Sequence, residues 1–435
     1  MTTRYQILEL KKMLTIYVIL TTLLYPIVII LPFFSEKAKV FLARRKLDKL
    51  EINRFSKDKS FNLEKSPVIW LHAASVGELD QCKALAKSIK ENEPGTYIIQ
   101  SVFSESVLEK NYDKENTFFT FRLPLDFYFS YDFIFKTFKP ESLVLMAWDT
   151  WPNLILAANR HKCSVYLASA VLNPKSKRGS FFARSLTKSV FSKLSGIGAV
   201  NESMLPAFRD LAGEKVKIQS LGDSRFDSVV DKIKSKKPDE SFVEFAKNYT
   251  KEPILILAST YKDCDLIVLE EIDKIISLGY SIWIFPHKID ADRIQETISF
   301  LQRKGYNASL YTKVKNPCKD RIILFDALGI LAFAYFYGRI AYVGGAVHNK
   351  VHNVLEPAYF GLPLLTGSKI FNSFDALELQ KKKSLRVVNS SKEFLEAIQV
   401  YSDENILKQF SATNKEYVLS RLGASLAFYN AFLKK

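Results

Sequence analysis

The segment from Trp70 to Glu78, WLHAASVGE, has the residue types of a catalytic strand–helix junction. It follows a short apolar run and precedes a helical pattern, and such junctions display reactive groups in α/β folds. Gly77 lets another backbone or a ligand approach closely. Glu78 falls in the first helical turn, where the helix dipole favours its ionised form, and an ionised carboxylate suits a general base. The alternative is that Glu78 only caps its helix.

A second segment combines glycines with a carboxylate, as nucleotide-binding loops do. It runs from Gly344 to Pro363, GGAVHNKVHNVLEPAYFGLP, after an apolar strand pattern that ends at Val343. A helix is expected near Asn353, and exposed N–H groups at a helix start bind phosphate readily. Glu356, one turn in, could accept hydrogen bonds from a ribose diol. The alternative is a tight turn with ordinary capping.

The histidines and cysteines give no metal or disulfide pattern. His348 and His352 are spaced i,i+4, but no HExxH sequence surrounds them, so no metal is expected. The four cysteines form no CxxC pair, and their scatter indicates a reducing compartment. They are Cys82, Cys163, Cys264 and Cys318.

Strand and helix patterns alternate along the chain and would position these segments. The first series of buried-strand patterns is 67–72, 97–102, 142–146, 164–168 and 217–221, with helical patterns between them such as 78–92 and 151–159. A second series is 254–258, 281–285, 322–325, 340–343 and 364–366. This alternation predicts parallel sheets with helices on both faces. Two doubly wound domains facing a cleft would hold a ligand at the carboxyl ends of their strands.

The length of 435 residues predicts two or three domains. The charged segment 227–253 lacks a strand pattern and is the predicted connection between them. We therefore expect a membrane anchor with its basic flank at residues 1–50, one Rossmann-like domain at 51–230 and another at 231–435.

Residues 13–34 carry no charged side chain. About 20 apolar residues match a hydrocarbon core of about 30 Å, so a transmembrane helix is expected, with a monotopic hairpin or an interfacial helix as the alternative. Basic residues are denser after this segment than before it, which keeps the long C-terminal part in the cytoplasm. Since the domains carry their own cores, we expect them to fold without this peripheral helix. The basic residues after the segment are Lys37, Lys39, Arg44, Arg45, Lys46 and Lys49.

The balance of 62 basic against 46 acidic residues gives a formal net charge of +16. Such an excess favours a polyanionic partner: nucleic acid, an anionic membrane surface or a phosphorylated substrate. No aromatic–basic nucleic-acid motif is present, so no nucleic acid is expected. The cations after the apolar segment can hold the body of the protein against anionic lipid.

Six short segments form an ordered set between about residues 68 and 380. They are 72–78 (HAASVGE), 146–153 (MAWDTWPN), 222–227 (GDSRFD), 258–260 (AST), 352–357 (HNVLEP) and 371–372 (FN). Each resembles the corresponding segment of the Kdo transferases of lipopolysaccharide assembly, which attach 3-deoxy-D-manno-octulosonic acid (Kdo), and HAASVGE is reproduced in full. One such match would be weak, whereas six in order are specific.

The resemblance implies a GT-B glycosyltransferase, with an acceptor domain at 51–230 and a CMP-sugar-binding domain at 231–435. The family takes Kdo from CMP-Kdo and places it on a hydroxyl of the lipid A precursor (lipid IVA), in lipopolysaccharide core biosynthesis at the cytoplasmic face of the inner membrane. It therefore implies CMP-Kdo as the donor substrate and no cofactor. The implied partners are the lipid A precursor and an anionic membrane surface.

The resemblance also implies roles for individual residues. Glu78 would deprotonate the acceptor hydroxyl, Arg225 would offset charge on the phosphate or sugar carboxylate, and Asp149 would stand near the oxocarbenium-like centre. CMP would be held by Pro286, His287, Leu328, Gly329, Ile330, Asn353, Val354, Leu355 and Glu356. Two alternatives stay open: another GT-B enzyme that uses a different activated sugar, and a non-catalytic, membrane-tethered basic binding protein.

The chain departs from the family pattern at four places. The paired glutamates of the family's Met-Glu-Thr-Glu segment are Ala147 and Asp149 here, so one carboxylate is lost and the other is shorter. A lysine of the family is Arg225, which keeps the charge, and the arginine after its proline is His287. The Gly-Gly before the family's His-Asn is 350–351, Lys-Val, in this chain. These departures bear on donor and acceptor preference rather than on the fold.

Overall fold

The structure is a computed structural model that describes residues 2–55, 57, 66–172, 181–235, 237–249, 253–314 and 320–435. The chain forms two compact units, Met1–Ser228 with Leu422–Lys435, and Val229–Arg421, and each is described by itself. Cys318 and residues 236 and 250–252 of the predicted connection lie outside the described residues.

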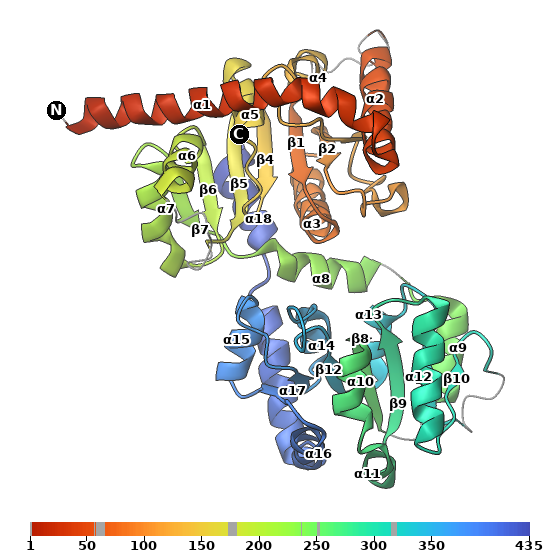
Figure 1. Cartoon of the computed structure of the whole chain (residues 1–435). Coiled ribbons are helices and arrows are strands. Elements are labelled where there is room, and N and C mark those ends of the chain that lie inside the picture. Colours follow the sequence, from red (N-terminus) through yellow and green to blue (C-terminus); the bar gives the residue numbers. More distant parts are fainter. Residues whose placement is uncertain are drawn as a thin grey trace. The chain divides into compact units, whose positions relative to one another are not determined.

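The first unit is built on a seven-stranded parallel sheet in the order β3-β2-β1-β4-β5-β6-β7. The strands are β1 (Val68–Ala73), β2 (Tyr97–Val102), β3 (Phe119–Arg122), β4 (Ser142–Met146), β5 (Ser164–Ala170), β6 (Gly196–Ala199) and β7 (Lys217–Ser220). The helices, labelled in Figure 1, are α1 (Thr2–Ile30), α2 (Glu36–Phe55), α3 (Val76–Asn92), α4 (Asp132–Phe138), α5 (Pro152–Arg160), α6 (Phe181–Phe191), α7 (Leu205–Ala212), the start of α8 (Ser224–Ser235) and α18 (Ala424–Phe428).

The second unit has a seven-stranded parallel sheet of its own, in the order β10-β11-β9-β8-β12-β13-β14. The strands are β8 (Ile254–Thr260), β9 (Ser281–Pro286), β10 (Ser309–Leu310), β11 (Ile322–Leu324), β12 (Gly338–Val343), β13 (Leu364–Thr366) and β14 (Leu385–Val387). The helices are the rest of α8, α9 (Glu240–Asn248), α10 (Lys262–Leu269), α11 (Ile272–Ser277), α12 (Ala291–Arg303), α13 (Leu331–Ala334), α14 (Leu355–Phe360), α15 (Phe374–Lys381), α16 (Ser391–Val400) and α17 (Glu404–Leu419).

The strand order reverses once in each sheet, between β1 and β4 in the first unit and between β8 and β12 in the second. A doubly wound parallel sheet opens a crevice at such a reversal, at the carboxyl ends of the strands, and ligands bind there. The predicted fold class, two Rossmann-like domains of the GT-B type, is thereby confirmed. That the two domains face a common cleft stays a prediction.

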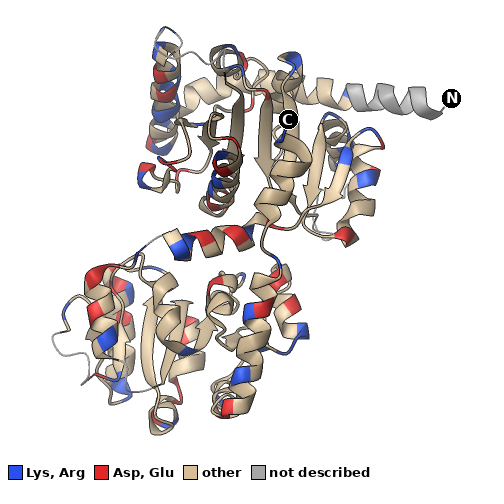
Figure 2. Ribbon diagram, turned by 180° about the vertical axis from the view of Figure 1, so that it is seen from behind, with Lys and Arg blue, Asp and Glu red and all other residues tan. Residues whose placement is uncertain are grey.

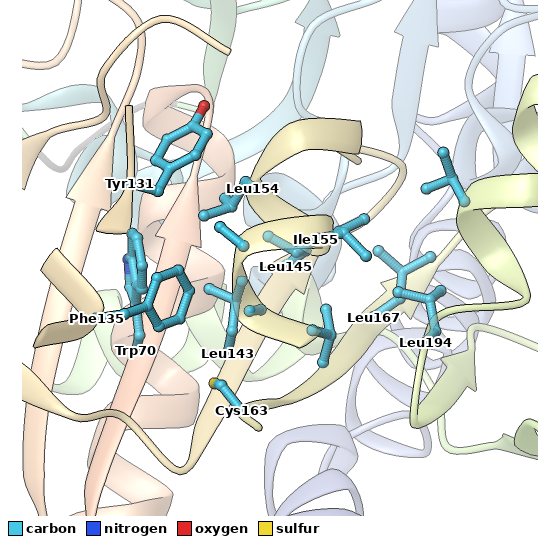
Figure 3. Close-up of a cluster of buried hydrophobic side chains, with 14 of the residues drawn as sticks. Trp70, Tyr131, Phe135, Leu143, Leu145, Leu154, Ile155, Cys163, Leu167 and Leu194 are labelled. Carbon is cyan, nitrogen blue, oxygen red and sulfur yellow. The ribbon is translucent and has the colours of Figure 1, made fainter. Parts of the chain in front are cut away.

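The central strand β1 is buried on both faces, and its side chains point alternately into two different core clusters. Trp70 packs in one core cluster with Phe135, Leu143 and residues of α5 (Figure 3). Its neighbour Leu71 belongs to a second cluster with the apolar face of α3. Strands buried on both sides read as continuous apolar runs, and this is why the sequence displayed them clearly.

The C-terminal residues, Leu422–Lys435, belong to the first unit. The predicted division had placed them in the second domain. Two glycines of β6 make room for them: a Cβ at Gly196 would lie 2.4 Å from the ring of Phe432, and a Cβ at Gly198 would lie 2.8 Å from that of Phe428. Asp227 holds the entry to α18 by accepting hydrogen bonds from the backbone of this segment. The final helix thus completes the first domain.

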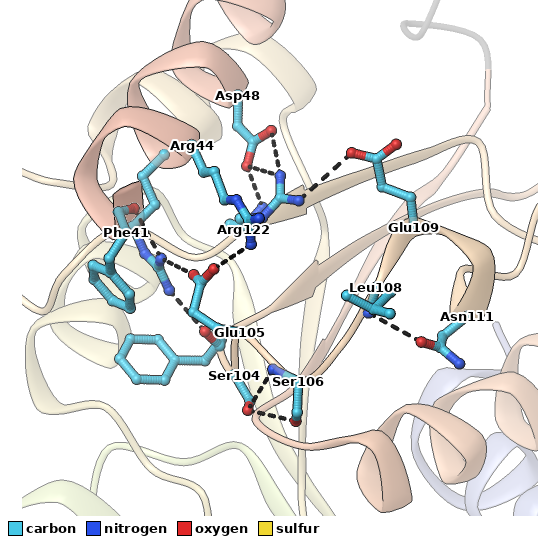
Figure 4. Close-up of polar contacts among 12 residues, drawn as sticks. Phe41, Arg44, Asp48, Ser104, Glu105, Ser106, Leu108, Glu109, Asn111 and Arg122 are labelled. Carbon is cyan, nitrogen blue, oxygen red and sulfur yellow. Dashed lines mark hydrogen bonds and ion pairs between the residues drawn. The ribbon is translucent and has the colours of Figure 1, made fainter. Parts of the chain in front are cut away.

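The N-terminal helices α1 and α2 pack on the first unit, and their role as a membrane anchor stays a prediction. On α2, Asp48 accepts a hydrogen bond of 2.8 Å from the backbone N–H of Arg122 and pairs with its guanidinium (Figure 4). Arg44 pairs with Glu105 at 2.6 Å. Residues 12–33 form one helix long and apolar enough to cross a membrane, by length and composition.

Candidate active site

Glu78 lies at the strand reversal of the first unit, in the first turn of α3 directly after β1. Its Oε2 accepts hydrogen bonds from the backbone N–H groups of Ala74 at 2.6 Å and Ser75 at 3.2 Å. The hydroxyl of Ser75 accepts from the N–H of Glu78 in return, so the two form a capping box. Glu78 therefore does cap its helix, as the simpler interpretation held. Its Oε1 accepts no hydrogen bond from any residue that the structure describes.

The environment of Glu78 raises the pKa of its carboxyl above the usual value, mainly through burial and next through the charge of Asp149. The hydrogen bonds from Ala74 and Ser75, and the nearby His72, act in the opposite direction. A raised pKa makes a carboxylate a stronger proton acceptor, which suits a general base. Capping and catalysis are thus compatible, because they use different oxygens.

Asp149 follows β4, on the other side of the same reversal, and it is held by two ring nitrogens. Its Oδ2 lies 3.0 Å from Nε2 of His72 and accepts a hydrogen bond of 2.7 Å from Nε1 of Trp151. His72 is fully buried near the end of β1, and its Nδ1 lies 2.8 Å from the hydroxyl of Ser101 on β2. The structure therefore brings together the two predicted carboxylates Glu78 and Asp149.

A chain of side-chain contacts runs from Trp70 through Ser101 and His72 to Asp149. The hydroxyl oxygen of Ser101 accepts from Nε1 of Trp70 at 2.8 Å, so its own proton is available to Nδ1 of His72. Nε2 of His72 lies 3.0 Å from Oδ2 of Asp149 and 3.1 Å from Nε1 of Trp151. These contacts orient the carboxylate of Asp149 from the core outward.

Ala147, which replaces a glutamate of the family, adopts a left-handed backbone conformation with φ of 54°. Its N–H donates to the carbonyl of Ala168 and its carbonyl accepts from Val171, so the turn is tied to β5. Alanine has no side chain that stabilises this conformation, and such strain typically costs about 1–3 kcal/mol. The turn bends the chain sharply after β4 and places Asp149 at the carboxyl edge of the sheet.

Arg225, the third predicted catalytic residue, is paired within its own loop. Its Nε and Nη2 donate to Oδ2 of Asp223 at 2.8 and 2.5 Å. The side chain of Asp223 is buried, with 2% exposed, whereas the side chain of Arg225 is 41% exposed. Gln81, one turn after Glu78 on α3, contacts the other oxygen of Asp223 at 3.4 Å. Asp223 thus fixes Arg225 beside α3 and offsets part of its charge.

In the second unit, Pro286 and His287 lie at the carboxyl end of β9, next to β8 in the sheet. The ring of His287 stacks on His352 with 4.5 Å between centroids and lies 4.7 Å from that of Tyr261, which follows β8. Burial lowers the pKa of His352 from 6.5 to about 4 and also lowers that of His287. The three rings form a neutral aromatic surface at neutral pH.

Two glycines after β12 permit close backbone approach at this edge. A Cβ at Gly344 would lie 2.3 Å from the carbonyl oxygen of Ser259. Gly345 has φ of 95°, and a Cβ there would lie 2.4 Å from the carbonyl oxygen of Lys350 and 2.9 Å from the ring of His352. Side chains are excluded at both positions, which sets the path of the loop toward the predicted nucleotide-binding residues.

The loop after β11 carries three further predicted residues. Leu328 is 79% exposed, Gly329 has φ of 88°, and Ile330 is buried. Because β11 is the neighbour of β9, this loop opens at the same edge of the sheet as Pro286. An exposed leucine there is available to a ligand.

The helix predicted near Asn353 begins at Leu355. The side-chain oxygen of Asn353 accepts a hydrogen bond of 3.0 Å from the backbone N–H of Leu355, while Val354 and Leu355 are buried. Glu356 is buried too, and its Oε1 accepts a hydrogen bond of 2.7 Å from Nζ of Lys232 on α8. The predicted ribose contact therefore belongs to a carboxylate that already forms an ion pair.

Several residues of the site were absent from the predicted set, among them His72, Trp151, Asp223, Tyr261, His352 and Lys232. His72 stood within the HAASVGE segment, and that was the one signal that pointed to it. Trp151, Asp223 and His352 also stood within such segments, at 146–153, 222–227 and 352–357, whereas Tyr261 and Lys232 lie in none of them. In the part of the chain that the structure describes, no three His, Cys, Asp or Glu side chains gather to hold a metal ion.

Known proteins with similar sequences point to one family. Residues 50–228 match the family model described as 3-deoxy-D-manno-octulosonic-acid transferase (kdotransferase). The 3-deoxy-D-manno-octulosonic acid transferase of Haemophilus influenzae is 25% identical over 75% of this chain and 77% of its own length. That of Rickettsia bellii is 22% identical over 93% of this chain and 96% of its own length. A bifunctional glycosyltransferase/methyltransferase of Fusobacterium nucleatum is 26% identical over 86% of this chain, which spans 57% of that relative.

Solved structures share the fold. The UDP-GlcNAc 2-epimerase from Neisseria meningitidis covers 85% of this chain and all of its own with a TM-score of 0.63 and 12% identity. A glycosyltransferase from Rickettsia africae covers 84% of this chain and 97% of its own with a TM-score of 0.57 and 12% identity. The predicted resemblance is confirmed by the family model over residues 50–228 and by the Kdo transferases that match most of this chain.

Proposed function

We propose that this protein transfers Kdo from CMP-Kdo to a hydroxyl of the lipid A precursor. The observation that carries the proposal is the position of Glu78 and Asp149 on the two sides of the strand reversal, in a chain similar to Kdo transferases. The reversal is where this fold binds ligands, and the two carboxylates there have different partners. Different partners allow different roles.

Glu78 is the general base in this proposal. Oε2 is held by two backbone N–H groups, which fix the carboxylate, and Oε1 faces the acceptor hydroxyl. Glu78 takes the hydroxyl proton as the oxygen forms its bond to the anomeric carbon of Kdo. The bond from that carbon to the phosphate of CMP breaks at the same time, and the electron pair leaves with CMP.

Asp149 and Arg225 stabilise charge in this reaction. Asp149, oriented by His72 and Trp151, lies near the anomeric carbon as it gains oxocarbenium character. Arg225, fixed by Asp223, interacts with the donor's phosphate or carboxylate through the exposed part of its guanidinium. Two positioned charges of opposite sign match a transition state in which the sugar becomes positive and the leaving group negative.

CMP is bound by the second unit in this proposal. Pro286, His287 and the loop at 328–330 supply an apolar and aromatic surface, Asn353 and Glu356 supply polar groups, and the buried Val354 and Leu355 support them. The neutral ring stack of Tyr261, His287 and His352 suits a planar base better than a phosphate. No cofactor is required, because positioned side chains offset the leaving charge.

The proposed acceptor and location follow from charge and from α1. A lipid A precursor carries phosphates and acyl chains, and a chain with net charge +16 and an apolar N-terminal helix suits such a substrate. We propose that the protein is bound to the inner membrane with its two domains on the cytoplasmic face.

The proposal is tested by product analysis with the full chain in detergent micelles. Tetra-acylated lipid A precursor is incubated with CMP-Kdo or, separately, with UDP-GlcNAc, and the lipid is examined by mass spectrometry. A gain of one or more Kdo residues with CMP-Kdo alone is the expected result. Sugar transfer from UDP-GlcNAc would instead support a glycosyltransferase with a different donor, and no transfer from either would support a binding protein.

A further inference from the structure

The buried carboxylate of Asp126 joins α1 to the helix that follows the candidate active site. Its Oδ2 accepts hydrogen bonds from the hydroxyl of Tyr17 at 2.9 Å and from the N–H of Asn153 at 3.2 Å. Its Oδ1 accepts from the N–H of Leu154 at 3.1 Å and from the hydroxyl of Tyr131 at 2.9 Å. Asp126 thus caps α5 and holds α1 beside it. A hydrogen bond to a buried carboxylate is a strong contact, and α1 is fixed by one.

One stripe of α1 faces the first unit. Leu14 is buried in the same core cluster as Trp70, and the hydroxyl of Thr21 accepts a hydrogen bond of 3.2 Å from the side-chain amide of Asn153. The ring of Tyr25 meets the edge of Phe127 at 5.0 Å. The stripe recurs every three or four residues, as one face of a helix does: Leu14, Tyr17, Thr21 and Tyr25.

The opposite stripe of α1 is apolar and exposed. It has the same spacing and lies about 180° around the helix, at 100° per residue. Its members are Ile16, Ile19, Leu23, Ile27 and Ile30, each between 39% and 68% exposed. Phe33 and Phe34 extend this surface beyond the end of the helix, at 84% and 82% exposure. A continuous apolar surface of this kind marks a contact with a partner or with lipid.

The length of the docked stripe excludes an upright membrane span for α1 as it packs here. Leu14 to Tyr25 corresponds to about 17 Å of helix, and only about 14 Å remain from Tyr25 to Phe34. A hydrocarbon core is about 30 Å thick. An upright α1 would therefore carry its neighbours to the depth of the hydrocarbon, including the carboxyl group of Asp126 and the start of α5. Burial of such polar groups in lipid is costly.

α1 and α2, the helix that follows it, differ in their content of charged residues. Figure 2 shows the described part of α1 with almost no Lys, Arg, Asp or Glu, whereas α2 carries many. The exposed cations of α2 are Lys37, Lys39, Lys46, Lys49 and Arg54. Cations beside an apolar surface bind anionic headgroups, at about 1 kcal/mol each. An apolar stripe followed by cations is typical of a helix that lies in the membrane interface.

We propose that α1 lies in the plane of the membrane surface, with one stripe fixed to the first domain and the opposite stripe inserted among the lipids, so that the chain does not cross the bilayer. The partner is an anionic phospholipid surface. This proposal deepens the membrane part of the proposed function, and its tests measure no transfer, so the two can fail separately. It also sets the start of α5, which follows Asp149, close to the lipid surface.

The proposal predicts a uniform depth along α1. Single cysteines at Ile16, Ile19, Leu23, Ile27 and Ile30, in a full chain whose native cysteines are replaced by alanine, are labelled with a fluorophore. The labels are quenched with brominated lipids in vesicles of phosphatidylethanolamine and phosphatidylglycerol. We expect equal depth at all five positions and no quenching of a control label at the exposed Val400 of α16. A depth that changes steadily, by about 20 Å from Ile16 to Ile30, would overturn the proposal.

A second measurement needs no cysteine replacement. Epitope tags at both ends of the otherwise native chain are exposed to protease in spheroplasts and in inverted inner-membrane vesicles. We expect both tags to be cleaved in inverted vesicles and both to be protected in spheroplasts. Cleavage of the N-terminal tag alone in spheroplasts would show a spanning helix and overturn the proposal, as would release of the whole chain from vesicles by a salt wash.

Discussion

Oδ2 of Asp149 lies 3.0 Å from Nε2 of His72, across the strand reversal of the first domain. His72 is fully buried on β1, whereas the side chain of Asp149 is 23% exposed, so the pair runs from the core to the surface of the site. The family has a longer glutamate at the position of Asp149. Here a shorter carboxylate is held by His72 and Trp151.

The first prediction concerns the pH dependence of transfer. The charge of Asp149 contributes to the raised pKa of Glu78, so Asp149→Asn is expected to lower that pKa. A general base must be ionised, and activity falls as the pH drops through its pKa. The acid limb of the kcat/KM profile should therefore lie above the range of an ordinary carboxylate in the wild type. It should move to lower pH in Asp149→Asn, while kcat falls about 10²-fold through lost charge stabilisation.

The matched control is Asp80→Asn, on the exposed side of the same helix, where Asp80 pairs with Lys83. This variant is expected to keep the wild-type profile. An acid limb in Asp149→Asn at the wild-type position would show that Asp149 does not act on the titrating group.

The second prediction concerns nucleotide binding. Glu356→Ala is expected to weaken CMP binding by about 1.5–3 kcal/mol, because a charged hydrogen bond to the ribose is lost. Titration of CMP by calorimetry measures this directly. Lys232→Met removes the ion-pair partner but leaves the carboxylate, so it should weaken CMP binding less. Unchanged CMP affinity in Glu356→Ala would contradict the assignment.

The third prediction revises an expectation drawn from the sequence alone. Deletion of residues 1–35 was expected to leave the domains folded, but Leu14 belongs to the first core and Tyr17 donates to Asp126. The deletion should therefore lower the free energy of unfolding of the first domain by at least about 2 kcal/mol, the minimum cost of emptying a buried leucine position.

Urea denaturation in detergent compares the truncated chain with the full one. Tyr17→Phe, which removes one hydroxyl, is the smaller perturbation and should cost about 1–3 kcal/mol. If the truncated chain unfolds at the same urea concentration as the full chain, α1 contributes nothing to the fold and is only a tether.

Most of the fold could be predicted because buried parallel strands are apolar throughout. The predicted strands 97–102, 142–146 and 364–366 agree with β2, β4 and β13 to the residue. The strands without a prediction lack that signal. β6 is Gly-Ile-Gly-Ala, whose glycines make room for the C-terminal helix, and β10 has two residues.

The site was partly predictable for a different reason. Glu78 and Asp149 stand in segments with a recognisable order of residues, whereas the contact between His72 and Asp149 joins positions 77 apart in sequence. The pairing of Arg225 with Asp223 is local, yet burial of the carboxylate depends on α3. The stripe of α1 that packs on the first domain could not be predicted from the sequence. The side of α1 that contacts protein and the side proposed to contact lipid are both mainly apolar, so hydrophobicity does not distinguish them.

The most direct test of the account is single-turnover Kdo transfer by Glu78→Gln. The enzyme, with CMP binding confirmed by calorimetry, is mixed with CMP-Kdo and lipid A precursor, and the product is followed by mass spectrometry. Because the base is lost while the cap geometry is kept, we expect the rate to fall about 10²–10⁴-fold with CMP affinity unchanged. A Glu78→Gln enzyme that keeps more than about a third of the wild-type rate would contradict Glu78 as the base, and Glu78 would then be a helix cap alone.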